Sequence, residues 1–200
     1  MIAEGPALIL CDRNRRCVNI LEQLFAGARG VEVRHGDLLA TEAEALICPG
    51  NGFGFLDSPL ERELVQVLGP TLQPQLLEAI RARHGGELMV GEALVLCTGR
   101  EQPTHLVYAP LYRIPEDLSR SYHVYYAFRG ALRAAIGQCR DGGGGLRSLG
   151  SIALGAGSAR VPPLRAARQM KAAYDAVLGK KGLSFPSLFA ARKAHQELMR

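Results

Sequence analysis

Short apolar runs alternate along this chain with longer segments in which apolar residues recur every three or four positions. The short runs predict strands and the periodic segments predict helices. This alternation is typical of crossover connections, so it predicts a largely parallel sheet with helices on both faces. The expected strands are residues 7–11, 30–34, 45–48, 93–97, 106–109 and 149–154.

The periodic segments have recognisable ends. Asp12 is a candidate N-cap for the first helix, and Ser119 is one for the helix that carries an aromatic stripe. Such a stripe either packs in the core or stacks against bases, and its helical spacing favours packing. The helix after Ser119 carries the stripe at Tyr122, Tyr125, Tyr126 and Phe128. The other expected helices are the one that follows Asp12 as far as Gly27 and those at residues 60–68, 74–84, 162–178 and 187–200.

The length and apolar content are enough for one sizeable core. Of 200 residues, 48% are apolar, and chains of this size bury roughly 70% of the surface that they expose when unfolded. We expect residues 1–180 to form one domain, with Gly142–Gly145 as a flexible connector inside it. Residues 181–200 are expected to form a basic helix or tail that either packs on the domain or contacts a partner.

Several classes of protein are excluded at this stage. No apolar run approaches the roughly 20 residues that span a bilayer, and the N-terminus carries Glu4 in place of a cationic signal start. We therefore expect a soluble, cytoplasmic protein without a membrane partner. The five cysteines form no C-x-x-C pair and the five histidines are widely spaced, which predicts a reducing compartment, no metal site and no cofactor.

The charge leaves two interpretations open. The net charge is +5, and four of the 24 basic residues are Lys, which leaves 20 Arg. The planar guanidinium matches phosphate oxygens well, so this composition suits an anionic ligand. A GC-rich genome would also favour Arg codons, and the Arg residues are scattered.

The strongest local signal is the segment from Leu154 to Pro163, LGAGSARVPP, in which a strand end, a small-residue loop and a helix start follow one another. Small side chains let backbone N–H groups approach an anion, and the N-terminus of the next helix adds unpaired donors. Proline at the first helical position removes no donor that the helix needs. The segment predicts a phosphate-binding loop in which Arg160 adds a charged contact.

A dinucleotide-binding turn is the competing interpretation of that loop. Arg160 stands where its third glycine belongs, and no later strand can carry the acid that binds the ribose. A purely structural tight turn also stays open, because a lone G-x-G is weak support.

A second polar loop follows the third expected strand. In Pro49-Gly50-Asn51-Gly52, Asn51 stands among glycines, where its amide can donate to and accept from a ribose hydroxyl. By itself such an asparagine indicates only a turn. The interpretation as a ligand-binding loop is favoured by two other polar loops that are expected at the same sheet edge, at Gly36-Asp37 and at Gly155–Arg160.

These loops occur in the order and spacing of the macrodomain family. Residues 31–57 resemble its V-x-x-G-D-I segment, followed by V-N-A-A-N and a glycine-rich stretch. Residues 149–177 resemble its final strand, its G-T-G-x-x-G-x-P loop and its Ala-rich helix, and the similarity covers about residues 7–178. The resemblance implies a three-layer α/β/α fold with a mixed, mostly parallel central sheet, and binding of ADP-ribose or a related ADP-ribosyl or nucleotide ligand.

The same resemblance implies a role for each loop. Asp37 would accept a hydrogen bond from the adenine amino group beside the Leu38 backbone, and Asn51 would hold the distal ribose. Independently of the resemblance, Asp57 is the only carboxylate in the two loops at 52–57 and 155–160 that could orient a water, which makes Asn51 and Asp57 the candidate catalytic pair. We expect Asp37, Asn51 and Gly157 around one cleft. The full set of expected ligand contacts is Asp37, Leu38, Asn51, Gly52, Phe55, Gly155, Ala156, Gly157, Ser158, Ala159 and Arg160.

Two departures from the family pattern bear on function. Residues 53–59 lack the usual Gly-Gly pair and include Pro59, which has no backbone donor, and Ser158-Ala159-Arg160 stand where glycine is typical. These changes favour a protein that binds ADP-ribose, free or on a macromolecule, with weak or no ADP-ribosyl hydrolase activity. The alternatives are a hydrolase proper and an α/β domain that binds nucleic acid through its basic helices.

Overall fold

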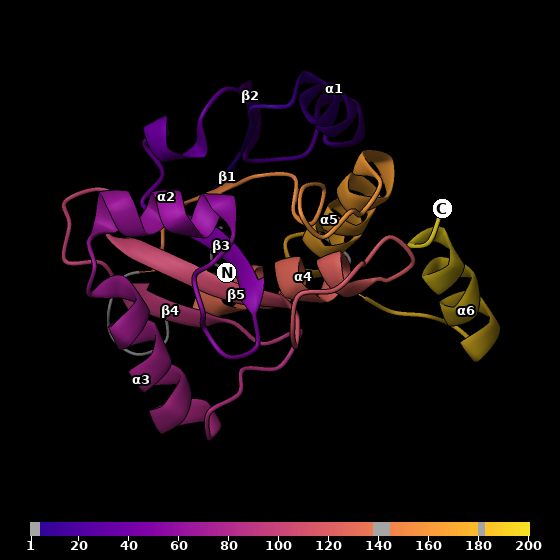
Figure 1. Cartoon of the computed structure of the whole chain (residues 1–200). Coiled ribbons are helices and arrows are strands. Elements are labelled where there is room, and N and C mark those ends of the chain that lie inside the picture. The colour runs from indigo at the N-terminus through magenta and orange to yellow at the C-terminus, as the bar shows by residue number, and fades with distance from the viewer. Residues whose placement is uncertain (1–4, 138–144, 180–182) are drawn as a thin grey trace.

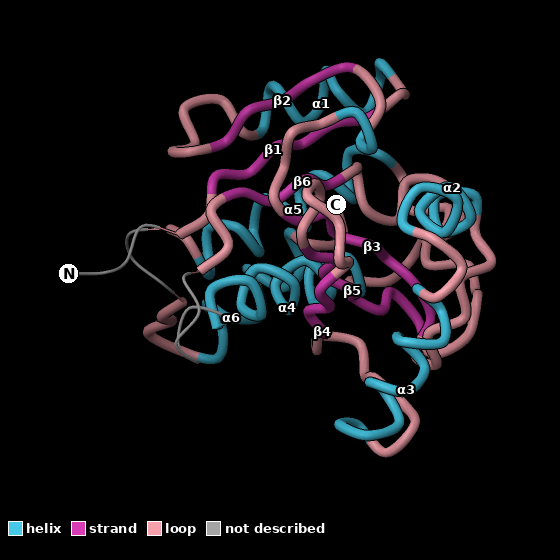
Figure 2. Tube along the Cα trace, turned by 90° about the vertical axis from the view of Figure 1, so that its left-hand side faces the viewer, coloured by secondary structure: helices cyan, strands magenta, loops and turns pink. Residues whose placement is uncertain are grey.

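The computed structural model describes residues 5–137, 145–179 and 183–200, and its core is one sheet. The six strands lie in the order β2-β1-β6-β3-β5-β4, which Figure 2 shows from the top of the view to the bottom. Neighbouring strands are parallel except β4, which runs antiparallel to β5. The strands are β1 (Ala7–Asp12), β2 (Val31–His35), β3 (Ala45–Asn51), β4 (Leu94–Cys97), β5 (His105–Tyr112) and β6 (Ser148–Ser151).

Helices cover both faces of the sheet and make three layers (Figure 1). One face packs a core that includes Leu21, Phe128 and Met170, and the other packs a core that includes Leu64 and Ile80. The expected α/β/α architecture with a mixed, mostly parallel sheet is confirmed. The first face carries α1 (Arg15–Leu24), α4 (His123–Gly137) and α5 (Pro163–Val177), and the second carries the short 3₁₀ helix η1 (Leu38–Ala40), α2 (Pro59–Leu68) and α3 (Leu72–His84).

The sequence predicted Asp12 as the N-cap of the first helix, and the structure shows that this is wrong. Asp12 is the last residue of β1, and the side chain of Asn14 caps α1. One Asp12 carboxylate oxygen accepts from the Asn14 N–H at 2.8 Å, and the other accepts from the Ala153 N–H at 3.0 Å. The strand β6 ends at Ser151, short of the residue 154 that the sequence predicted, and Ala153 lies just beyond it. Asp12 thus ties two loops of the same sheet edge together.

The aromatic stripe is only partly core. The α4 helix begins at His123, so Ser119 lies too early to cap it. Phe128 is buried, whereas Tyr126 is 40% exposed and makes edge-to-face contacts with Tyr122 and Tyr125. The side chains toward the start of the stripe therefore form a surface row, and those further along it form the core.

The C-terminal helix α6 (Leu188–Glu197) lies beyond α4 and α5 in Figure 1. None of its residues is buried. Two of the contacts that hold it are the ring of His195 against Tyr122 and the Leu198 carbonyl, which accepts from the buried Gln169 side chain at 2.9 Å. The division into a domain at 1–180 and a separate tail stays a prediction, and residues 142–144 of the expected connector lie outside the described residues.

Three further findings apply to the described residues. No helix there is long and apolar enough to cross a membrane. No group of three or more His, Cys, Asp or Glu side chains is placed to hold a metal ion. The cysteines at 11, 17, 48 and 97 are free thiols.

Candidate functional site

A cleft of about 250 Å³ opens where β1, β2 and β6 end. Residues 12–14 after β1 and 36–38 after β2 form part of its wall, residues 59, 60 and 63 of α2 form another part, and residues 152, 153, 156 and 157 complete it. Open α/β sheets bind ligands at this edge, because the carboxyl ends of parallel strands and the helix N-termini meet there. The sequence-predicted residues Asp37, Leu38, Ala156 and Gly157 all line the cleft.

The loop between β6 and α5 is shaped by two of its own hydrogen bonds. Gly155, at φ +74°, accepts from the Val161 N–H at 2.9 Å, and Gly157 accepts from the Arg160 N–H at 2.9 Å. Within the described residues, the N–H groups of Gly157, Ser158 and Ala159 have no acceptor. Of these three residues Gly157 lines the cleft, and successive free amides shortly before a helix that begins at Pro163 are typical of an anion-binding loop.

The side chains of this loop point elsewhere than the sequence predicted. Arg160 does not line the cleft, and its guanidinium lies 3.7 Å from Asp117 on the loop before α4. Ser158 hydrogen-bonds to Tyr112, whose pKa is raised by burial. The part of this loop that lines the cleft is therefore Ala156 and Gly157, and the Arg160 guanidinium lies beside Asp117.

Another part of the cleft wall carries an ion network centred on Arg13. The Asp37 carboxylate accepts from Arg13 Nη2 at 2.7 Å and from the Leu39 N–H at 3.0 Å. Arg13 also donates from Nη1 and Nη2 to the two oxygens of Glu63 on α2, both at 2.9 Å. The Arg13 guanidinium holds the pKa of Asp37 below its usual range. Sequence reasoning missed Arg13 and Glu63, and the one available signal was that Arg13 directly follows a strand at this edge.

Asn51 does not line the cleft, contrary to expectation. It is the last residue of β3 and only 7% exposed. Its Nδ2 donates to the Phe55 carbonyl at 2.7 Å, and its Oδ1 accepts from the N–H groups of Phe53 and Phe55 at 3.0 and 3.3 Å. The amide is turned into its own loop, because that loop has backbone groups that need partners. Asn51 therefore shapes residues 52–55.

The other predicted residues of this loop lie away from the cleft. Gly52 is buried and donates to the Arg113 carbonyl at 3.0 Å. Phe55 is 49% exposed and Asp57 is exposed, and neither lines the cleft. Pro59 does form part of the wall, as the first residue of α2, so this helix start offers a ligand one N–H fewer.

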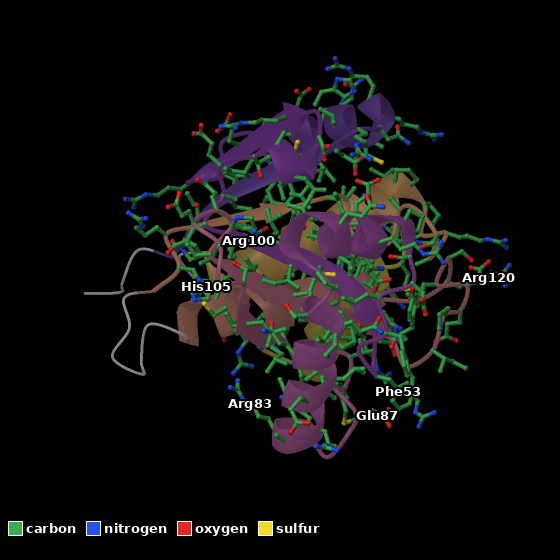
Figure 3. All side chains as sticks on the ribbon, turned by 60° about the vertical axis from the view of Figure 1, so that its left-hand side comes forward. Phe53, Arg83, Glu87, Arg100, His105 and Arg120 are labelled. Carbon is green, nitrogen blue, oxygen red and sulfur yellow. The ribbon has the colours of Figure 1, made fainter. Side chains whose placement is uncertain are left out.

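The buried carboxyl of Glu61 holds the end of the same loop. Glu61 is 3% exposed and accepts from the Ser58 N–H at 2.5 Å and from the backbone of Asp57. Burial raises its pKa above the ordinary value. Beyond the loop, Arg113 pairs with Glu87 at 2.8 Å and lies over the Phe53 ring, and Figure 3 labels Phe53 and Glu87 at the same end of the molecule.

The raised pKa of Glu61 makes the stability pH-dependent. Between its ordinary and its raised pKa, the folded state binds more protons than the unfolded state, so this group destabilises the fold as pH rises from about 4.5 through that window. We expect the stability of wild type relative to Glu61→Gln to fall over this range. Urea unfolding at several pH values measures the difference, and a pH-independent difference would contradict the assignment.

Comparisons with known proteins agree on the fold. No family model and no curated protein sequence matches this chain. Among solved structures, the macrodomain of Mycobacterium tuberculosis DarG is similar with a TM-score of 0.57 and 19% identity, over 76% of this chain and 94% of that one. The macrodomain of Thermus aquaticus DarG gives 0.56 and 21%, over 72% and 89%. An Oceanobacillus iheyensis macrodomain mutant solved with ADP-ribose gives 0.58 and 19%, over 72% and 76%. The chain thus has the macrodomain fold, as the sequence resemblance implies.

Proposed function

We propose that this protein binds ADP-ribose or a closely related nucleotide in the cleft between Asp37 and Gly157. The observation that carries the proposal is that one cavity is lined both by an acidic acceptor, Asp37, and by a free backbone donor, the N–H of Gly157. Structures with this fold from O. iheyensis and Trypanosoma brucei were solved with ADP-ribose or ADP. The diphosphate lies on the amides of residues 157–159, and the base lies toward Asp37.

The size of the cleft suggests which parts of the ligand lie inside it and which lie outside. Ligand pockets usually enclose about 300–1,000 Å³, and this one encloses about 250 Å³. The cleft holds the adenosine and diphosphate, and the distal ribose lies outside it, toward the loop at 52–57. An ADP-ribosyl group attached to a macromolecule is compatible with this arrangement, because its attachment point stays exposed.

Calorimetric titration with ADP-ribose tests the proposal. We expect saturable binding to wild type and weaker binding to Asp37→Ala, because a hydrogen bond to a charged group contributes about 1.5–3 kcal/mol. Arg34→Ala is the control, since its ion pair with Glu32 on β2 lies outside the cleft. No heat and no shift in melting temperature at millimolar ADP-ribose would overturn the proposal.

Hydrolysis requires the scissile ribose to be held within about half an ångström of its productive geometry. The Asn51 amide is committed to its own loop, and Asp57 is exposed. We therefore expect no multiple turnover when wild type is incubated with a mono-ADP-ribosylated protein and released ADP-ribose is measured. Robust turnover that is lost in Asp57→Ala would show the protein to be a hydrolase. A slow release that is equal in wild type and Asp57→Ala would indicate a contaminant.

The remaining expectations keep their status as predictions. A cytoplasmic location is inferred from the sequence alone. Nucleic-acid binding through the basic C-terminal segment is the alternative partner, and it predicts a strong fall in affinity for mixed RNA as salt rises. Within the described part of that segment, Glu197 pairs with Arg200 at 2.8 Å, which reduces the positive charge available to a nucleic acid.

A further inference from the structure

Arg13 connects two walls of the cleft. It stands in the loop between β1 and α1, and its guanidinium donates to Asp37 after β2 and to both carboxylate oxygens of Glu63 on α2. A paired, fork-shaped contact of this kind fixes the plane of a guanidinium as well as its position. The side chain is nevertheless 59% exposed and lines the cleft. Arg13 therefore presents a flat, immobilised face.

Two simpler roles account poorly for this geometry. Exposed ion pairs contribute little to stability, so a role as a structural brace does not require three charge-assisted bonds at the mouth of a cleft. A role as a phosphate ligand is disfavoured, because two carboxylates already neutralise the guanidinium. The free backbone donors that suit a phosphate belong to a different segment of the wall, at Gly157.

The surroundings of Arg13 suit a flat ring. The same cleft also has apolar surface, which comes from Leu38, Pro59, Leu60 and Ile152. A guanidinium stacks on aromatic faces, and an exposed apolar surface next to it shields the stack from water. Among the described residues that line this cavity none is aromatic, and Arg13 supplies its one guanidinium.

We propose that Arg13 is the base-positioning residue of the cleft: its guanidinium, held flat by Glu63 and Asp37, stacks against the heteroaromatic ring of a nucleotide whose phosphates lie at Gly157. This inference rests on the proposed function and adds the contact that orients the base. Glu63 contributes indirectly, because it holds the guanidinium in its plane.

The test compares two ligands that differ only in the base. ADP carries it, and ribose 5-diphosphate has the same sugar and phosphates without it. We expect Arg13→Lys, which keeps the charge and loses the plane, to lower the affinity for ADP by about tenfold and to leave the affinity for ribose 5-diphosphate unchanged. Ligand-observed NMR measures both dissociation constants at millimolar concentrations. Glu63→Gln is expected to act in the same direction with a smaller effect.

Arg34→Lys is the matched control, because Arg34 also makes a paired contact with a glutamate but lies outside the cleft. It is expected to change neither affinity, and circular dichroism checks that every variant is folded. An equal loss of affinity for both ligands would indicate that Arg13 contacts the phosphates. Unchanged affinity for both would indicate that Arg13 does not contact the ligand. Either result would overturn the inference and leave the proposed function standing. Failure of wild type to bind ADP or ADP-ribose would overturn the proposed function and the inference together.

Discussion

Replacing Gly157 with glutamate is expected to abolish ADP-ribose binding without unfolding the protein. A Cβ at Gly157 meets no atom within 4 Å, and the residue lines the cleft beside the free loop amides. The new carboxylate would occupy the space in front of those donors and repel the diphosphate. We expect a loss of at least about a hundredfold in affinity, measured by calorimetry, because both the anion contacts and the space are removed.

Two further variants at position 157 separate the steric effect of the new side chain from the effect of its charge. Gly157→Ala adds only a methyl group in open space and is expected to keep most of the affinity, and Gly157→Gln blocks the site without adding charge. We expect Gly157→Gln to fall between Gly157→Ala and Gly157→Glu. Full binding by Gly157→Glu would show that the phosphate lies elsewhere. Gly155 is unsuitable for this test, because a Cβ there would lie 2.8 Å from Val124 at a positive φ.

Replacing Asn51 with alanine is expected to lower the free energy of unfolding by about 3 kcal/mol. The buried amide makes three hydrogen bonds to the backbone of Phe53 and Phe55, and each such bond contributes about 1 kcal/mol net. Urea unfolding measures the change. The result matters for any activity assay, since a loss of activity in Asn51→Ala would then report the collapse of a loop and not a missing catalytic group.

Asp57→Ala is the matched control within the same loop. Its side chain is exposed, so we expect the free energy of unfolding to change by less than about 0.5 kcal/mol. Equal stability of Asn51→Ala and wild type would contradict the structural role of Asn51. It would also restore the sequence-based hypothesis in which the Asn51 amide is free to hold a ribose.

The cleft itself was largely predictable. The alternation of strand and helix patterns predicts a parallel sheet, and in such a sheet the loops after β1, β2 and β6 must meet at one edge. The small residues at 155–159 likewise predict a loop that exposes its backbone, since glycine and alanine cannot cover it. For these reasons the sequence predicts Asp37 and Gly157 at one cleft, which both residues line, and their contacts with a ligand stay a prediction.

The partners of the polar side chains were decided by the tertiary structure. Arg13 and Glu63 are 50 positions apart, and Asp12 and Ala153 are 141 apart. No local pattern reveals which of many exposed charges will meet when the sheet closes. At Asn51 the residue type suggested a ligand contact, and in the structure the side-chain amide bonds to the backbone of its own loop.

The sequence by itself thus determined the layers, the order of the loops and the exposed backbone of the loop at Gly157, because these follow from hydrophobic periodicity and from residue size. Only the tertiary structure decided that Arg13 pairs with Asp37 and Glu63, that Asn51 faces its own loop and that α6 buries none of its residues. Side-chain direction and ion pairing depend on which distant segments come within about 3 Å of one another, and that depends on the packing of the whole domain.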